Sequence, residues 1–95
     1  MNKMINLDEY VGKAIHCPTE ELANEFLNLA HEQGFRWRVG DSLIENNYWD
    51  KFKENTCYIL LKNKIVNFGR IAYFETYAYE IFEFEGGERK LWRLL

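Results

Sequence analysis

The sequence predicts a single α+β domain over residues 1–95, with one amphipathic helix packed on a mostly antiparallel sheet of four to five strands. Three observations predict it. Only one segment has a clear helical apolar stripe, the segments around it are rich in β-branched and aromatic residues, and 95 residues have room for one core. Aromatic residues make up 17% of the chain, enough to fill a small core with few side chains. The expected order is β-α-β, then a β-hairpin and a further strand.

The helix is the best-defined element. A strand is expected at residues 10–17, with Gly12 as a bulge or bend, and Pro18 ends it. Thr19 is a suitable N-cap for a helix over residues 20–33, whose first turn carries two glutamates. The residues expected on its buried face are Leu22, Ala23, Phe26, Leu27 and Ala30, with Leu29 at the margin. Gly34 then suits the left-handed position that closes a helix, with Phe35 as the hydrophobic contact of a Schellman motif.

Residues 35–39, FRWRV, predict the second strand and pose a question about Trp37. An exposed tryptophan between arginines is suited to stacking a nucleotide, whereas a strand places alternate residues on opposite faces. Phe35 and Val39 favour the apolar side, so we expect Trp37 to be buried with them. Arg36 and Arg38 then point outward on the other face.

The second half is expected to be mostly strand. Residues 41–52 read as a loop with one or two helical turns, and residues 56–61 as a strand. A tight turn at residues 62–64, with Asn63 at positive φ, leads to a hairpin partner at residues 65–68. Residues 69–78 fit either a continued strand or an aromatic loop. Residues 79–85 alternate as a strand, and the last six residues predict a short strand or a docked tail.

Charge and cysteine content exclude several classes. A net charge of −3 argues against a general nucleic-acid binder, although a few arginines can still hold a small anion. No signal peptide or membrane-spanning segment is visible, so a cytoplasmic protein without membrane association is expected. Cys17 and Cys57 do not form a disulfide framework and are expected as reduced core residues; a bond between them stays open if their strands are neighbours.

The sequence carries no catalytic or metal-binding motif. His16 and His31 lack the recurrent spacing of metal ligands, and no nucleophile elbow, Walker sequence or dinucleotide fingerprint occurs. Glu83 and Glu85 are expected on a solvent-facing strand surface. We therefore predict a non-enzymatic protein with no cofactor and no metal; a small nucleotide hydrolase is the alternative.

Two features indicate binding. The stretch DSLIENNYWDKFKENTCY, residues 41–58, supplies Tyr48, Trp49 and Tyr58, which either stack a ligand or cover the core. Candidate anion ligands are the arginines Arg36, Arg38 and Arg70. The apolar tail docks either on its own sheet or on a second copy of the chain, as a homodimer.

The stretches FRWRVGDSLIENNYWDKFKENTCYILL and GRIAYFETYAYEIFEF resemble small, uncharacterised proteins of phages and prophages of Firmicutes, over roughly residues 14–84. The resemblance implies a setting in which small proteins counter bacterial defence by stoichiometric binding. The favoured hypothesis is capture of a small nucleotide immune signal in the host cytoplasm. The alternative is inhibition of a host defence protein through its surface, as anti-CRISPR proteins act.

Overall fold

The computed structural model describes residues 5–86 and the backbone of residues 92–93, and it confirms the α+β class. The elements in chain order are η1 (Leu7–Tyr10), β1 (Ala14–His16), α1 (Glu20–Glu32), β2 (Arg36–Trp37), α2 (Trp49–Phe52), η2 (Lys53–Asn55), β3 (Thr56–Leu61), β4 (Ile65–Arg70), α3 (Ile71–Thr76), β5 (Ile81–Glu83) and β6 (Trp92–Arg93). The sheet has six strands, more than expected, because two-residue strands form both edges.

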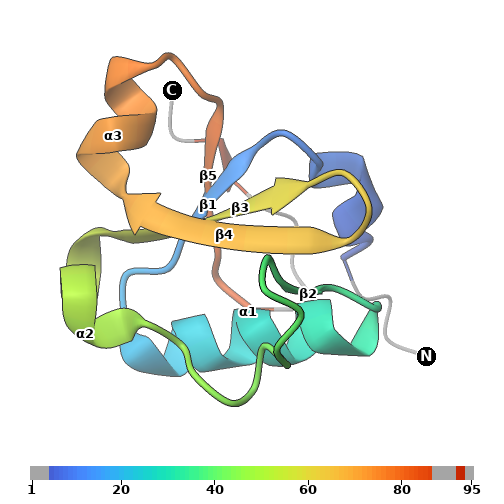
Figure 1. Cartoon of the computed structure of the whole chain (residues 1–95). Helices are drawn as coiled ribbons and strands as arrows, with labels where there is room; N and C mark the ends of the chain where they lie inside the picture. The colour runs from blue at the N-terminus through green and yellow to red at the C-terminus, as the bar shows by residue number, and fades with distance from the viewer. Residues whose placement is uncertain (1–4, 87–91, 94–95) are drawn as a thin grey trace.

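The sheet is mostly antiparallel, in the order β2-β4-β3-β1-β5-β6 (Figure 1). β3 pairs antiparallel with β4 and β1, and β6 pairs antiparallel with β5. The β1–β5 and β2–β4 pairs are parallel. The expected hairpin is present, and both Asn63 and Lys64 in its turn have positive φ.

Helix α1 covers one face of the sheet, and the main core lies between them (Figure 1). Its buried residues are Ala23, Phe26, Leu27, Leu29 and Ala30, close to the expected stripe. Thr19 caps the helix by accepting from the Leu22 amide. The Schellman motif is confirmed, since Phe35 N donates to Ala30 O and Gly34 N donates to His31 O, both at 3.0 Å.

The first strand is shorter than expected. Residues 7–10 form η1 because Asn6 Oδ1 accepts from the Asp8 amide and Leu7 is buried in the core. Gly12, with φ of +88°, then bends the chain into β1. The prediction of a strand over residues 10–17 was therefore wrong at its N-terminal half.

The second strand confirms the inward Trp37 but not the inward Val39. Trp37 is 4% exposed, whereas Val39 is 78% exposed. The reason is a turn immediately after Trp37, in which Gly40 N donates to the Trp37 carbonyl at 2.8 Å. The strand alternation thus ends two residues earlier than the sequence pattern predicts.

A short helix, α3, covers part of the opposite face of the sheet (Figure 1). Residues 71–76 were expected as strand or loop. Phe74 of α3 packs on a second buried cluster of Ala14, Cys57, Ile59 and Ile81. Ile81 is therefore buried rather than solvent-facing, and β3 is buried on both of its faces.

The two cysteines are unbonded and lie in different clusters. Cys17 belongs to the core under α1, and Cys57 to the cluster under α3. The two strands are neighbours, as the open alternative required, but the side chains pack on opposite sides of the sheet. This placement does not suit a disulfide between them.

Candidate functional site

The face of the sheet beside α3 is hollowed. A hollow of about 400 Å³, which we call the α3 hollow, has a floor made by β3 and β4. Its floor residues are Ile59, Leu61, Asn67 and Gly69. These lie on this face because Cys57, Ile59 and Leu61 alternate with Tyr58 and Leu60, which pack toward α1.

Aromatic rings form the wall of the α3 hollow. Tyr73, Phe74 and Tyr79 contact one another, with ring centroids 5.1 Å apart for Tyr73–Phe74 and 5.2 Å for Phe74–Tyr79. Tyr73 is 49% exposed, so part of its ring faces solvent. The wall is a preformed aromatic surface suited to a planar ligand.

Gly69 lets this wall approach the sheet. A Cβ at Gly69 would lie 3.1 Å from Cε2 and 3.3 Å from Cζ of Phe74, closer than ordinary van der Waals contact. The glycine is therefore used for close packing of α3 on β4.

Replacing Gly69 with alanine should displace the Phe74 ring and lower the free energy of unfolding by about 1–3 kcal/mol, as overpacking does. Urea denaturation measures this change. In a Phe74→Leu background the same replacement should have a smaller effect, because the two ring atoms that it meets are gone. An equal loss in both backgrounds would contradict the proposed contact.

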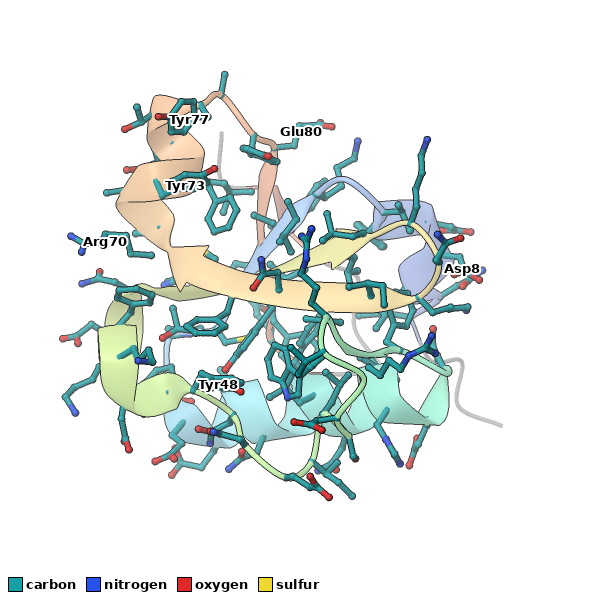
Figure 2. The ribbon with its side chains drawn as sticks, viewed as in Figure 1. Asp8, Tyr48, Arg70, Tyr73, Tyr77 and Glu80 are labelled. Carbon is teal, nitrogen blue, oxygen red and sulfur yellow. The ribbon has the colours of Figure 1, made fainter. Side chains whose placement is uncertain are left out.

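Two arginines face the α3 hollow. Arg38 enters from the turn after β2, and Arg70 from the end of β4, where its guanidinium carbon lies 5.3 Å from the centroid of Phe52. Figure 2 shows Arg70 and Tyr73 at the same end of the sheet, with the Arg70 side chain extending outward from the end of β4. Neither arginine is ion-paired with a carboxylate within the part of the chain that the structure describes. Both guanidinium groups can therefore bind an anion without first breaking an internal ion pair.

Asn67 adds a polar group to the floor. Its Oδ1 accepts from the Phe68 amide at 2.9 Å, which fixes the side-chain orientation and leaves the amide nitrogen to donate. The hollow thus combines two cations, one amide donor and an aromatic wall.

The three predicted stacking residues do not line this hollow with the arginines. Tyr58 is fully buried, stacks on Phe26 at 5.7 Å and donates its hydroxyl to the Asn47 carbonyl at 2.5 Å. Burial also raises the pKa of the Tyr58 hydroxyl. The prediction that Tyr58 stacks a ligand was wrong, because the side chain at this position of β3 points into the core.

Tyr48 and Trp49 cover the core from the loop. Tyr48 stacks on Phe68 with centroids 4.5 Å apart and lies on the α1 side of β4 (Figure 2). Trp49 is half-buried against the same core. Asn46 and Asn47 form turns by accepting from the Tyr48 and Trp49 amides, both at 2.9 Å. The loop therefore serves as a lid on the core, the alternative to ligand recognition that the sequence left open.

Of the three candidate arginines, the structure brings two together. Arg38 and Arg70 line the same hollow, whereas Arg36 is exposed on β2 and does not line it. The sequence missed Tyr73, Tyr79, Phe52 and Asn67. The signal for Tyr73 and Tyr79 is the aromatic density of residues 71–79, but the sequence pattern favours a strand or an aromatic loop for residues 69–78 and a strand for residues 79–85.

The histidines and cysteines are placed for structure. His16 Nδ1 lies 2.6 Å from Glu83 Oε1, and Nε2 lies 2.7 Å from the Glu54 carbonyl oxygen. Both ring nitrogens are therefore occupied by protein oxygens, and neither is open to a metal. Cys57 lies opposite His16 in the sheet, but burial raises the pKa of its thiol to about 12, so the thiolate is scarce at neutral pH.

Comparisons with known protein families, curated proteins and solved structures find no match for this chain. No helix in residues 5–86 has the length and apolar character needed to cross a bilayer. The candidate site therefore rests on the geometry described above.

Proposed function

We propose that this protein is a non-enzymatic binding protein that captures a small anionic nucleotide in the α3 hollow. One observation carries the proposal: Arg38 and Arg70 face the same hollow as an aromatic wall, in a chain of net charge −3. No Asp or Glu is among the residues that line the hollow. An acidic protein thus has a locally cationic, aromatic surface that matches a phosphate joined to a planar base.

Each part of a nucleotide has a partner there. The guanidinium groups of Arg38 and Arg70 bind phosphate oxygens through paired hydrogen bonds. The base stacks on Tyr73 or Tyr79, which contributes about 1–3 kcal/mol at comparable aromatic surfaces. Asn67 donates to an acceptor on the base or the sugar.

The lining favours binding over turnover. It contains neither His nor Cys, and it lacks carboxylates that would act as a general base. The histidine–carboxylate pair elsewhere on the sheet is fully hydrogen-bonded, as described for His16. These features support stoichiometric capture, with the ligand released chemically unchanged.

The resemblance to small phage and prophage proteins of Firmicutes gives the proposal its setting. A protein that removes a nucleotide immune signal from the host cytoplasm would block bacterial defence without any enzymatic step. Capture of the signal needs one binding site per molecule and a protein concentration higher than that of the nucleotide.

Isothermal titration calorimetry against AMP, ADP, cyclic di-AMP, cyclic tri-AMP and cyclic ADP-ribose tests this proposal. We expect saturable binding of at least one of these nucleotides, and chromatography of the released ligand should recover it unchanged. The matched control is Ile44→Ala, because Ile44 is 57% exposed and does not line the hollow. A panel without binding would refute nucleotide capture, and turnover beyond one equivalent would favour the hydrolase alternative.

A second candidate is binding to a host defence protein. Tyr73 and Tyr77 are both exposed, and their ring centroids are 4.8 Å apart (Figure 2). Tyrosine and arginine are enriched among the residues that dominate protein–protein binding energy. The Arg38→Gln variant separates the candidates, since it should weaken nucleotide binding but leave a protein complex formed through Tyr73 and Tyr77 unchanged.

A further inference from the structure

We propose that the captured nucleotide is a dinucleotide, with its second nucleoside in a neighbouring hollow on the same face of the sheet. This inference rests on the proposed function and goes beyond it, because it names the ligand class. It follows from the shape, the charge and the apolar surface of the sheet beyond the α3 hollow.

The neighbouring hollow, which we call the hairpin hollow, lies at the turn between β3 and β4. It has a volume of about 630 Å³ and is lined by Val11, Gly12, Arg38, Leu61, Lys62 and Ile65. Both hollows fall within the size range of small-ligand pockets, about 300–1,000 Å³. Each is therefore large enough for one nucleoside.

The two hollows are adjacent, because Arg38 and Leu61 line both. The floor runs along β4 from Gly69 in the α3 hollow to Ile65 in the hairpin hollow. At the rise of a β-strand this is a length of roughly 13 Å. A ligand that fills the floor must be elongated and must pass Arg38 at its middle.

The cations along this floor match phosphates between two nucleosides. Arg38 is at the junction, Arg70 borders the α3 hollow, and Lys62 borders the hairpin hollow. Among the described residues that line either hollow there is no carboxylate. Lys13 and Lys64, by contrast, each bind a carboxylate, Glu80 at 2.5 Å and Asp8 at 2.9 Å.

The hairpin hollow has an apolar surface on which the flat face of a nucleotide base can pack. Val11, Leu61 and Ile65 are all half-buried and give it an apolar lining without aromatic rings. A second base would lie on these aliphatic side chains while its sugar and phosphate stay near Arg38 and Lys62. A mononucleotide bound at the α3 hollow would leave this surface uncovered.

Two variants of the hairpin hollow test the inference with cyclic di-AMP and AMP as probes. Val11→Trp fills the hollow, and Val11 has ordinary extended φ and ψ that accept tryptophan. We expect it to weaken cyclic di-AMP binding by at least about tenfold, the contribution of one covered base, and to leave AMP binding within about twofold. Lys62→Gln should weaken cyclic di-AMP by about threefold to fivefold, as loss of one exposed charge pair does.

Lys51→Gln is the matched control, because Lys51 is an exposed lysine that lines neither hollow, and it should leave both affinities unchanged. Thermal unfolding of each variant confirms that it folds; if Val11→Trp does not, Lys62→Gln decides the test. Equal affinity of the wild-type protein for AMP and cyclic di-AMP, with neither probe sensitive to these variants, would overturn the dinucleotide inference and leave nucleotide capture standing. Absence of binding by both probes would overturn both proposals.

Discussion

Replacing Trp37 with alanine is expected to destabilise the protein by about 3–5 kcal/mol, the largest single effect on folding that we predict. A buried aromatic side chain leaves a cavity as well as losing its burial. Trp37 contacts three rings, with centroid distances of 4.9 Å to Tyr48, 6.0 Å to Phe68 and 6.1 Å to Tyr58. Its Nε1 also donates to the Asn46 carbonyl at 3.1 Å.

Because of these contacts, the loss extends beyond one side chain. Trp37 ties β2 to the loop that ends at α2, so removing it loosens the lid on the core. For a domain of this size we expect the melting temperature to fall by at least about 12 °C. Circular dichroism during heating and urea titration measure both quantities.

Arg36→Gln is the control for Trp37→Ala. Arg36 is adjacent in sequence but exposed, and its replacement should change stability by less than about 0.5 kcal/mol. If Trp37→Ala were no more destabilising than Arg36→Gln, the assignment of Trp37 as a core residue would be wrong.

Replacing Arg38 and Arg70 together with glutamine is expected to weaken nucleotide binding by about 100-fold or more. Each charge-assisted hydrogen-bonding contact contributes about 1.5–3 kcal/mol, although neighbouring contacts need not add. Both side chains are exposed, so the double variant should fold like the wild-type protein. Calorimetry with the tightest nucleotide of the panel measures the loss, and each single variant should lose part of it.

The matched control for the double variant is again Arg36→Gln. It removes the same kind of charge two residues before Arg38, but Arg36 does not line either hollow. Raising the salt concentration should weaken binding to the wild-type protein and have less effect on the double variant. Equal losses in Arg36→Gln and Arg38→Gln would indicate a general charge effect and contradict a site at the α3 hollow.

The sequence predicted an element correctly where a single residue determines the local backbone conformation. Thr19 and Gly34 fixed the two ends of α1 because a cap and a positive φ are local requirements. The pattern failed at Val39 because a strand ends where its partner ends, and β2 pairs with β4 only through Arg36 and Trp37. Gly40, which closes the turn after Trp37, does not by itself show where the pairing stops.

The site was harder to predict than the fold because it forms between distant segments. Arg38 and Arg70 were identified by type, and the structure brings them together through the β2–β4 pair. The prediction for Tyr58 was wrong because the alternation of side chains along β3 shows that the strand has two faces, but not which face packs against a helix. The presence of α3 on the second face depends on the packing of Phe74 over Gly69, a contact that the sequence does not reveal.

The parallel pairing of β1 with β5 has a consequence for how the chain folds. Residues 14–16 pair with residues 57–59 on one side and with residues 81–83 on the other. The centre of the sheet therefore forms only when β1 meets two strands that are far from it in the sequence. Such distant pairings slow folding, because a large loop must close before the contacts form. During synthesis, β1 leaves the ribosome long before either neighbour. The hairpin of β3 and β4 joins strands that are close in sequence, and β5 and β6 are the last strands to be synthesised.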